Sequence, residues 1–204
     1  MADTISHLFN MDKSRFTHSP SLFSVLDECT PFNVDKNYTA DSMRRSHRWA
    51  IRSLQEFVRT SDGYVNHPVV LIFRSVPGYS PINSVFVRLT RSQALYGIIQ
   101  GGIYEDLRDE STAFINEHAF FGTAIGGSLG ASKKNMHDIV AYTRARVRDD
   151  RPVHLLGIGG VRDIFHGVRQ GIDTFDCVHP SRLARHGGAL GKNEKHGTIS
   201  MEQI

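Results

Sequence analysis

The feature that most constrains the fold of this 204-residue chain is a strand–helix–strand unit near its carboxyl end. Residues 153–157 form a short apolar run typical of a buried strand, and Gly159-Gly160 predicts a tight turn after it. Residues 161–170 predict a helix that ends at Gly171, and residues 172–178 predict the next strand. Two neighbouring strands joined through a helix run parallel, so the unit requires a parallel sheet. The helix has four apolar residues at helical spacing, namely Val161, Ile164, Phe165 and Val168.

The same alternation extends towards the amino end. Further strands are predicted at 22–26, 94–99 and 122–125, and further helices at 39–58, 104–117 and 134–148, the last with Ser132 as its cap. Each strand runs directly into polar or glycine residues, a pattern typical of the α/β fold called the (β/α)8 or TIM barrel. A complete barrel has eight strands and about 250 residues. We therefore expect an incomplete TIM-barrel-like fold of about five β/α units.

The remaining segments set the expected domain boundaries. Residues 1–21 are polar and weakly patterned, and residues 22–186 hold the partial barrel. Residues 68–89 are β-rich with Pro-Gly punctuation, and they predict an insert within that barrel. Residues 187–204 are rich in Gly, Lys and His without an apolar period, and they predict a frayed tail.

Composition excludes several classes of protein. With 40% hydrophobic and 22% charged residues, the chain can build a core. It has no apolar run near the roughly 18 residues that a membrane span needs, and its first residues lack the apolar core of a signal peptide. Its two cysteines, Cys29 and Cys177, cannot build a disulfide framework, which favours a cytoplasmic location. The net charge of +3 is only a weak indication of a polyanionic partner.

Polar groups that follow the predicted strands are the candidates for chemistry, although each has a simpler explanation. Asp27 and Asp176 could be loop caps, and Gly157 could belong to an ordinary turn. The cysteines could be small packed side chains, and the histidines have no metal-ligand spacing. At one barrel mouth, however, a carboxylate, the amide of Gln100 and the bare N–H of Gly127 can read the edge of a purine. A second carboxylate could attack a glycosidic carbon.

Five stretches carry a specific resemblance to a known family. They are residues 25–31 (VLDECTP), 95–108 (LYGIIQGGIYEDLR), 124–127 (AIGG), 154–159 (HLLGIG) and 171–185 (GIDTFDCVHPSRLAR). In order and content they resemble the tRNA-guanine transglycosylase, or queuine tRNA-ribosyltransferase, family. The similarity runs from about residue 26 to residue 189 and is interrupted by residues 68–89.

The resemblance implies a transferase of queuosine biosynthesis that exchanges guanine at the tRNA wobble position for a 7-deazaguanine, queuine or preQ1. By this resemblance, Asp176 is the nucleophile that holds the tRNA covalently. Asp27 reads the base, and Gln100 and the Gly127 backbone donate to its carbonyl oxygen. The remaining matches are pocket residues Cys29, Leu156 and Gly157, and anticodon-phosphate ligands Arg182 and Arg185. The expected partners are the tRNA anticodon loop and the free base, with no membrane and with a possible homo- or hetero-oligomer.

One further position, Gly130, bears on base size. Bacterial enzymes of the family that take preQ1 usually have Val here, whereas eukaryotic enzymes that take the bulkier queuine have Gly. Gly130 thus favours queuine, and a loop glycine with positive φ is the equally simple alternative.

The sequence also departs from the family. It lacks the motif Asp-Ser-Gly-Gly-(Tyr/Phe)-Gln, which supplies the acid/base Asp and a stacking aromatic, and the Cys-x-Cys-x-x-Cys zinc motif. We therefore expect no cofactor or metal in this chain. A fragmentary gene model is the favoured explanation, ahead of a degenerate paralogue and of a half-barrel that needs a partner. The alternative function is a catalytically inactive fragment or a non-catalytic tRNA-binding partner subunit.

Overall fold

The structure is a computed structural model that describes residues 22–60, 94–127, 129–190 and 198–200. Its main sheet has five parallel strands in the order β1-β2-β3-β4-β5, which is also their order along the chain. The strands are β1 (Leu22–Ser24), β2 (Ala94–Ile99), β3 (Gly122–Ile125), β4 (Val153–Leu155) and β5 (Thr174–Phe175). The helices are α2 (Lys36–Thr60), α3 (Glu105–Glu117), α4 (Lys133–Arg144), α5 (Val161–Arg169) and α6 (His179–Arg185). The predicted α/β class and the incomplete barrel are confirmed.

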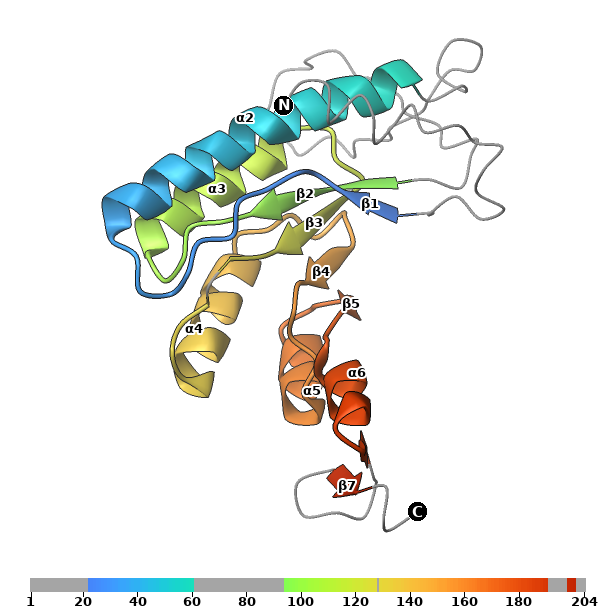
Figure 1. Ribbon diagram of the computed structural model, residues 1–204. Helices are drawn as coiled ribbons and strands as arrows, with labels where there is room; N and C mark the ends of the chain where they lie inside the picture. Colours follow the sequence, from blue (N-terminus) through green and yellow to red (C-terminus); the bar gives the residue numbers. More distant parts are fainter. Residues whose placement is uncertain (1–21, 61–93, 128, 191–197, 201–204) are drawn as a thin grey trace.

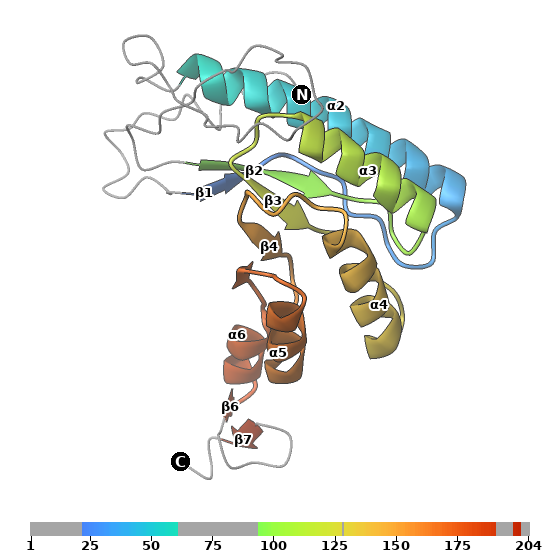
Figure 2. The same cartoon turned by 180° about the vertical axis from the view of Figure 1, so that it is seen from behind.

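The sheet curls, and its helices lie on the outer side of the curve (Figure 1). Helices α2 and α3 pack against β2, and α4 packs against β3 and α5. The view from behind shows the same half-barrel with β1 and β5 at its two ends (Figure 2). Within the described residues no helix has the length and apolarity that crossing a membrane demands.

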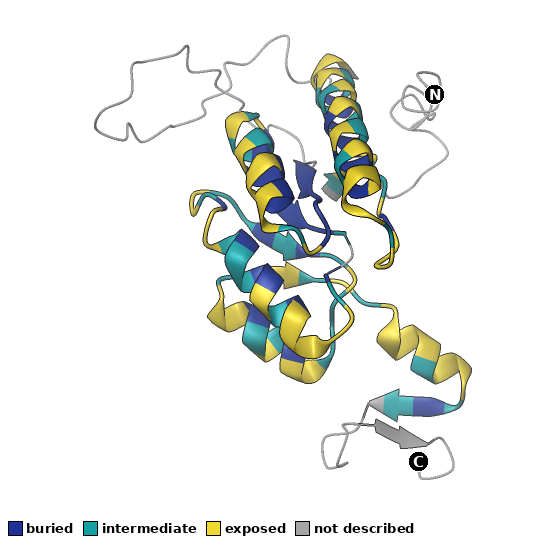
Figure 3. Cartoon of the chain, turned by 90° about the vertical axis from the view of Figure 1, so that its left-hand side faces the viewer, coloured by how far each residue is buried: buried dark blue, intermediate teal, exposed yellow. Residues whose placement is uncertain are grey.

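The core lies between the central strands and the inner faces of the helices. All six residues of β2 are buried, as are all four of β3, because these strands have neighbours on both sides and helices above them. The colouring by burial shows helices α2, α3 and α4 with one dark face and one exposed face, whereas α6 has no buried residue (Figure 3). Strands β2, β3 and β4 and helices α3 and α4 contribute core side chains, among them Leu95, Ile99, Ile115, Ile125, Val140 and Leu155.

Most predicted elements are present, with shifted ends. Helix α2 begins at Lys36 rather than at residue 39, because the Asp35 carboxylate accepts the N–H groups of Asn37 and Tyr38. The predicted cap of α4 is confirmed, since the Ser132 hydroxyl accepts the N–H of Asn135. Several predicted ends are wrong, and the strands predicted at 22–26 and 153–157 end two residues early, at Ser24 and Leu155. Helix α4 stops at residue 144, where the chain enters a turn, and β5 covers only residues 174–175 of the predicted 172–178.

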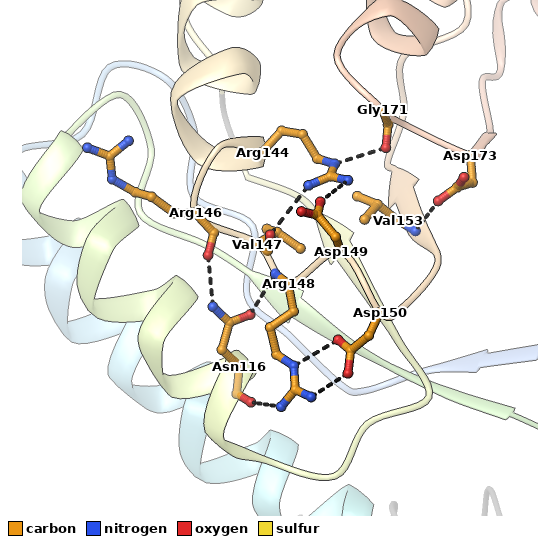
Figure 4. A network of polar contacts seen from close by, with 10 residues as sticks. All are labelled: Asn116, Arg144, Arg146, Val147, Arg148, Asp149, Asp150, Val153, Gly171 and Asp173. Atoms are coloured by element: carbon orange, nitrogen blue, oxygen red, sulfur yellow. Dashed lines mark hydrogen bonds and ion pairs between the residues drawn. The ribbon is translucent and has the colours of Figure 1, made fainter. Parts of the chain in front are cut away.

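A polar network closes the amino-terminal end of the sheet (Figure 4). The side chain of Asn116 donates to the carbonyl oxygen of Arg146 at 2.8 Å and accepts the N–H of Arg148 at 3.4 Å. Arg144 Nε donates to the carbonyl oxygen of Gly171 at 2.9 Å. These contacts join the loop before β4 to α3 on one side and to the turn before β5 on the other.

The β4–β5 pairing is fixed by a side chain as well as by the backbone. The carboxylate of Asp173 accepts the N–H of Val153 at 2.7 Å, and the Asp173 N–H donates to the Val153 carbonyl at 2.9 Å. This contact lies at the amino-terminal end of both strands (Figure 4). Asp173 therefore has a structural role at this end, whereas Asp176 lies at the opposite, carboxyl-terminal end of β5.

The predicted tail differs from expectation, and the predicted inserts lie outside the described residues. Residues 188–190 (β6, Gly188–Leu190) pair antiparallel with residues 198–200 (β7, Thr198–Ser200), so part of the segment 187–204 is paired rather than frayed. Backbone hydrogen bonds hold this hairpin, which is why side-chain periodicity did not predict it. Segments 1–21 and 68–89 lie outside the described residues, and the domain boundaries stay a prediction.

Helix α5 forms as predicted, but its apolar residues face outward. Val161, Phe165 and Val168 are 54%, 67% and 56% exposed. The buried positions of this helix are Asp163 and Gly167. Glycine is needed at residue 167, because a Cβ there would lie 2.7 Å from the ring of Phe175. The exposed apolar side of α5, defined by Val161, Phe165 and Val168, is thus free to associate with another apolar surface.

We expect the chain to self-associate through this apolar side of α5. The double substitution Phe165→Glu and Val168→Lys should lower the mass measured by sedimentation velocity at a given concentration, because it places charges on the apolar surface. Phe32→Glu is the matched control, since Phe32 is 44% exposed but lies in the loop after β1. A monomeric wild-type chain with a sharp, cooperative melt would contradict the expectation.

Candidate active site

The candidate residues follow the carboxyl ends of successive parallel strands. Asp27 comes after β1, Gln100 after β2, Gly127 after β3, Gly157 after β4 and Asp176 after β5. Parallel strands bring these ends to one edge of the sheet, as in complete barrels. The structure therefore gathers side chains that are up to 149 residues apart in the sequence, from residue 27 to residue 176.

A cavity of about 560 Å³ opens at this edge. Six of the predicted base-binding residues line it, namely Asp27, Cys29, Gly127, Gly130, Leu156 and Gly157. The rest of the lining comes mainly from residues 129–136, which lead into α4. Its volume lies within the range typical of small-molecule sites.

Asp27 and Gln100 form a hydrogen-bonded pair at this cavity. Gln100 is buried, and its Nε2 donates to Asp27 Oδ2. Burial raises the pKa of the Asp27 carboxyl, while the hydrogen bond from Gln100 opposes that rise. Gly127 packs against the same amide. Its φ is +83°, and a Cβ there would lie 2.6 Å from Gln100 Oε1, so only glycine leaves the amide in place.

Helix α2 holds the loop that carries Asp27, and sequence reasoning missed this. The Ser46 hydroxyl accepts the N–H of Glu28 at 2.8 Å, and the Ser42 hydroxyl donates to the Glu28 carbonyl at 3.2 Å. The Glu28 carboxylate accepts hydrogen bonds from Tyr38 and Arg45, beside α2 and away from the cavity. Of the adjacent carboxylates Asp27 and Glu28, therefore, only Asp27 lines the cavity. The sequence signal was a run of serines on the inner face of α2, which an apolar periodicity does not register.

A second buried contact, from Ser111 of α3, holds the backbone of Gln100. The Ser111 hydroxyl accepts the backbone N–H of Gln100 at 3.1 Å and lies 3.0 Å from Nε2 of His47. Since that oxygen already accepts one N–H, its own O–H can donate to a neutral His47 ring. Burial lowers the pKa of His47 to about 4, which is consistent with a neutral ring at pH 7.

The two carboxylate oxygens of Asp176 differ in their contacts. Its Oδ1 accepts the N–H of Gly157 at 2.9 Å and lies 3.1 Å from Nε2 of His154. The other nitrogen of His154 lies 2.8 Å from the Thr174 hydroxyl. Asp176 Oδ2 has no hydrogen-bond partner among the described residues, and the side chain is 54% exposed. His154 was not singled out from the sequence, because only the β4–β5 pairing places it beside residue 174.

Arg182 and Arg185 lie apart from the cavity lining. Both belong to α6, a short helix without buried residues, and both are exposed. The helix extends beyond β5 towards the β6–β7 hairpin (Figure 1). The structure therefore brings the base-binding candidates together and leaves the two arginines on a neighbouring surface.

The residues present do not fit the zinc site of the family. The sequence contains two cysteines, which are too few for the Cys-x-Cys-x-x-Cys motif. In the ranges that the structure describes, no group of three or more His, Cys, Asp or Glu side chains could hold a metal ion.

Comparison with known proteins identifies relatives of this chain. The family described as queuine tRNA-ribosyltransferase matches residues 17–204. The chain belongs to the queuine tRNA-ribosyltransferase family. It is 42% identical over 164 residues to the queuine tRNA-ribosyltransferase of Azoarcus sp. (strain BH72), which covers 80% of this chain and 36% of that protein. The same values hold for the queuine tRNA-ribosyltransferase of Roseiflexus sp. (strain RS-1). The chain thus spans about a third of the length of these relatives.

The neutral state of His47 makes stability depend on pH. The unfolded chain binds a proton at His47 near its ordinary pKa of 6.5, whereas the folded chain resists protonation down to about 4. Stability is therefore complete above pH 6.5 and falls as the pH drops towards 4. We expect the free energy of unfolding to fall by about 2 kcal/mol. This is less than the full pKa shift of His47 would give, because the ring is not completely shielded from water.

Urea unfolding at pH 7.5 and pH 4.5 checks this expectation. His47→Gln should be less stable than wild type at pH 7.5 but should lose less stability on acidification, since Gln does not titrate. Equal losses in the two proteins would show that His47 does not carry the effect.

Proposed function

We propose that this chain carries the base-recognition and nucleophile half of a tRNA guanine-exchange site. The observation that carries the proposal is the convergence of these groups at one edge of the sheet. Asp27 and Gly127 line the cavity there, Gln100 donates to Asp27, and Asp176 accepts the N–H of the lining residue Gly157. Membership of the queuine tRNA-ribosyltransferase family supports the choice of tRNA and of a queuine- or preQ1-type base as substrates. A cytoplasmic location accords with that substrate and stays a prediction.

Base recognition follows from the donors and acceptors at the cavity. The ionised carboxylate of Asp27 accepts from the N–H groups on the pyrimidine edge of guanine. One hydrogen of the Gln100 amide is used by Asp27, so the second can donate to the base carbonyl oxygen. The Gly127 N–H contacts the Cys29 thiol when no base is bound, and the base carbonyl oxygen would take the place of that sulfur. Cys29, Leu156 and Gly157 supply the walls of the cavity. Every group named here is already positioned without ligand by its own contacts, which reduces the entropy lost on binding.

The exchange reaction uses Asp176 as nucleophile. An oxygen of its carboxylate attacks C1′ of the ribose, the bond from C1′ to guanine breaks, and the bonding electrons leave with the base. The incoming base then attacks C1′ and releases Asp176. The contacts of Oδ1 with Gly157 and His154 hold the carboxylate while Oδ2 faces the substrate. The leaving base gains a proton and the incoming base loses one. The family motif that carries this proton is not in the sequence.

Arg182 and Arg185 would grip the anticodon phosphates beside this site. The two side chains lie on the same short helix directly after the strand end that carries Asp176. Guanidinium groups bind phosphate oxygens through paired hydrogen bonds. Their position outside the cavity suits a role in holding the RNA rather than the base.

Asp176→Asn should abolish the covalent adduct between the chain and its tRNA, because an amide is a poor nucleophile. The measurement is a gel shift of labelled tRNA under denaturing conditions in the presence of guanine. Asp173→Asn is the matched control. It is on the same segment, and its remaining oxygen can still accept the Val153 N–H, so it should keep the adduct. An adduct that persists in Asp176→Asn would show that another residue is the nucleophile.

A second function, that of a non-catalytic partner subunit, is favoured by one observation. The apolar side of α5, defined by Val161, Phe165 and Val168, is exposed. Absence of any adduct from the wild-type chain, combined with tRNA binding that Arg182→Ala and Arg185→Ala weaken, would support this second function. Adduct formation by the isolated chain would exclude it.

The size of the accepted base is tested best with the wild-type chain. Gly130 lines the cavity, which supports room for queuine, but its φ is +111° and a Cβ there would lie 2.8 Å from Cβ of Asn135. Any substitution would strain this loop, so Gly130→Val would not isolate base size. We expect queuine to compete with labelled guanine at least as well as preQ1 does. Competition by preQ1 alone would contradict the assignment to queuine.

A further inference from the structure

Arg108 is the largest fully buried side chain among the described residues, with 0% exposed, and the proposed function leaves it unused. It forms no ion pair with any carboxylate that the structure describes. A buried charge without a countercharge is costly, so a position of this kind calls for a compensating environment.

The compensation comes from three backbone carbonyl groups at the candidate site. Arg108 Nε donates to Gly102 at 2.8 Å, and Nη1 donates to Gly126 at 2.8 Å and to Ile99 at 3.3 Å. These carbonyls belong to the segments that leave β2 and β3, which carry Gln100 and Gly127. The third nitrogen, Nη2, has no hydrogen-bond partner in the described part of the chain. Part of the positive charge therefore remains unneutralised.

The contact with Gly126 acts on the neighbouring N–H. The carbonyl of Gly126 and the N–H of Gly127 belong to one peptide unit. A charged donor at the carbonyl oxygen draws electron density away from the amide, which makes its N–H a stronger donor. The free Nη2 lies on the same side, 3.4 Å from the position that a Cβ of Gly127 would occupy. Charge and polarised N–H thus lie together behind the cavity.

The pKa of Cys29, which lines the cavity, depends on both the Arg108 guanidinium and the Gly127 N–H. Burial raises the pKa of its thiol, and the nearby Asp27 raises it further. The positive charge of Arg108 and the N–H of Gly127 lower it. Burial lowers the pKa of Arg108 itself to about 9, so the guanidinium is charged at pH 7. The Cys29 thiol is therefore a reporter of the field that Arg108 produces in the cavity, with or without a ligand.

We infer that Arg108 is a positioning residue for the carbonyl oxygen of the base: it polarises the Gly126–Gly127 peptide and favours a ligand whose oxygen gains negative charge. The inference rests on the proposed base-exchange function. When the bond from C1′ to guanine breaks, the electron pair enters the purine and spreads onto its carbonyl oxygen. A fixed charge behind the N–H that holds this oxygen stabilises the departing base without reorganisation.

The first test compares two bases that differ at this oxygen. Guanine carries it together with an N1–H, 2-aminopurine lacks both, and the two bases share the amino group. Each base is therefore compared with itself between the wild type and the Arg108 variants, which leave Asp27 unchanged. In Arg108→Gln, which retains a donor without the charge, guanine should bind about tenfold more weakly and 2-aminopurine nearly as in wild type. Arg108→Lys keeps the charge and should retain most of the preference for guanine. Equal loss for both bases, or no loss for either, would reduce Arg108 to a structural support and overturn the inference.

The second test does not depend on base binding. Alkylation rates of Cys29 as a function of pH give its thiol pKa, with Cys177→Ser as the background so that one thiol is followed. Arg108→Gln should raise that pKa by about one unit, and Arg108→Lys should leave it near the wild-type value. Arg108→Met replaces the Gln variant if the latter does not melt cooperatively. An unchanged thiol pKa in the neutral variant would overturn the inference.

The two measurements separate the inference from the proposed function. If the wild-type chain binds neither base, the proposed function fails and so does the part of the inference that concerns a base. A raised thiol pKa in Arg108→Gln would then still establish the charge behind the Gly127 N–H. If the wild-type chain binds guanine and the thiol pKa does not respond to Arg108, the function stands and the inference fails.

Discussion

One buried guanidinium ties together the strand ends on which the site depends. Arg108 comes from the first turn of α3, yet it donates to carbonyl groups that follow β2 and β3. Two of these carbonyls, those of Gly102 and Gly126, lie where the chain leaves regular pairing, and Arg108 gives them a partner in a buried environment. The third, that of Ile99, also accepts the N–H of Gly126. With Arg108 in place, Gln100 and Gly127 are held at a fixed separation, and the cavity keeps its shape without a ligand.

Different ends of the sheet serve different purposes. At the amino-terminal end, Asp173 and the loop around Asn116 use their polar groups to fix the β4–β5 pairing and the connections to the helices. At the carboxyl-terminal end, Asp27 lines the cavity and the side chain of Asp176 is half exposed. This division is the one found in complete barrels, where stability and chemistry lie at opposite ends. The partial barrel therefore keeps a coherent candidate site although its helix α5 exposes an apolar side.

The site also depends on polar contacts between helix α2 and the segments that it covers, where apolar side chains are more common. The inner face of α2 presents Ser42 and Ser46 to the backbone of Glu28, and His47 reaches Ser111 beneath Gln100. Such contacts are directional, so they fix the loop that carries Asp27 more narrowly than apolar side chains would. They also make the helix less apolar on its buried side than its neighbours, which is why the hydrophobic pattern understates its role.

The sequence alone determined the class of fold, the order of the elements and the residues that follow each strand, because strand and helix periodicities and glycine turns are local properties. It also carried the family resemblance through five contiguous stretches. Only the tertiary structure decided which polar groups share contacts. The pairing of His154 with Asp176, the placement of Glu28 against α2 and the enclosure of Arg108 by three carbonyls join residues that are distant in the chain. The outward direction of the apolar residues of α5 was likewise not predictable, since helical spacing shows that they share a side but not which neighbour covers it.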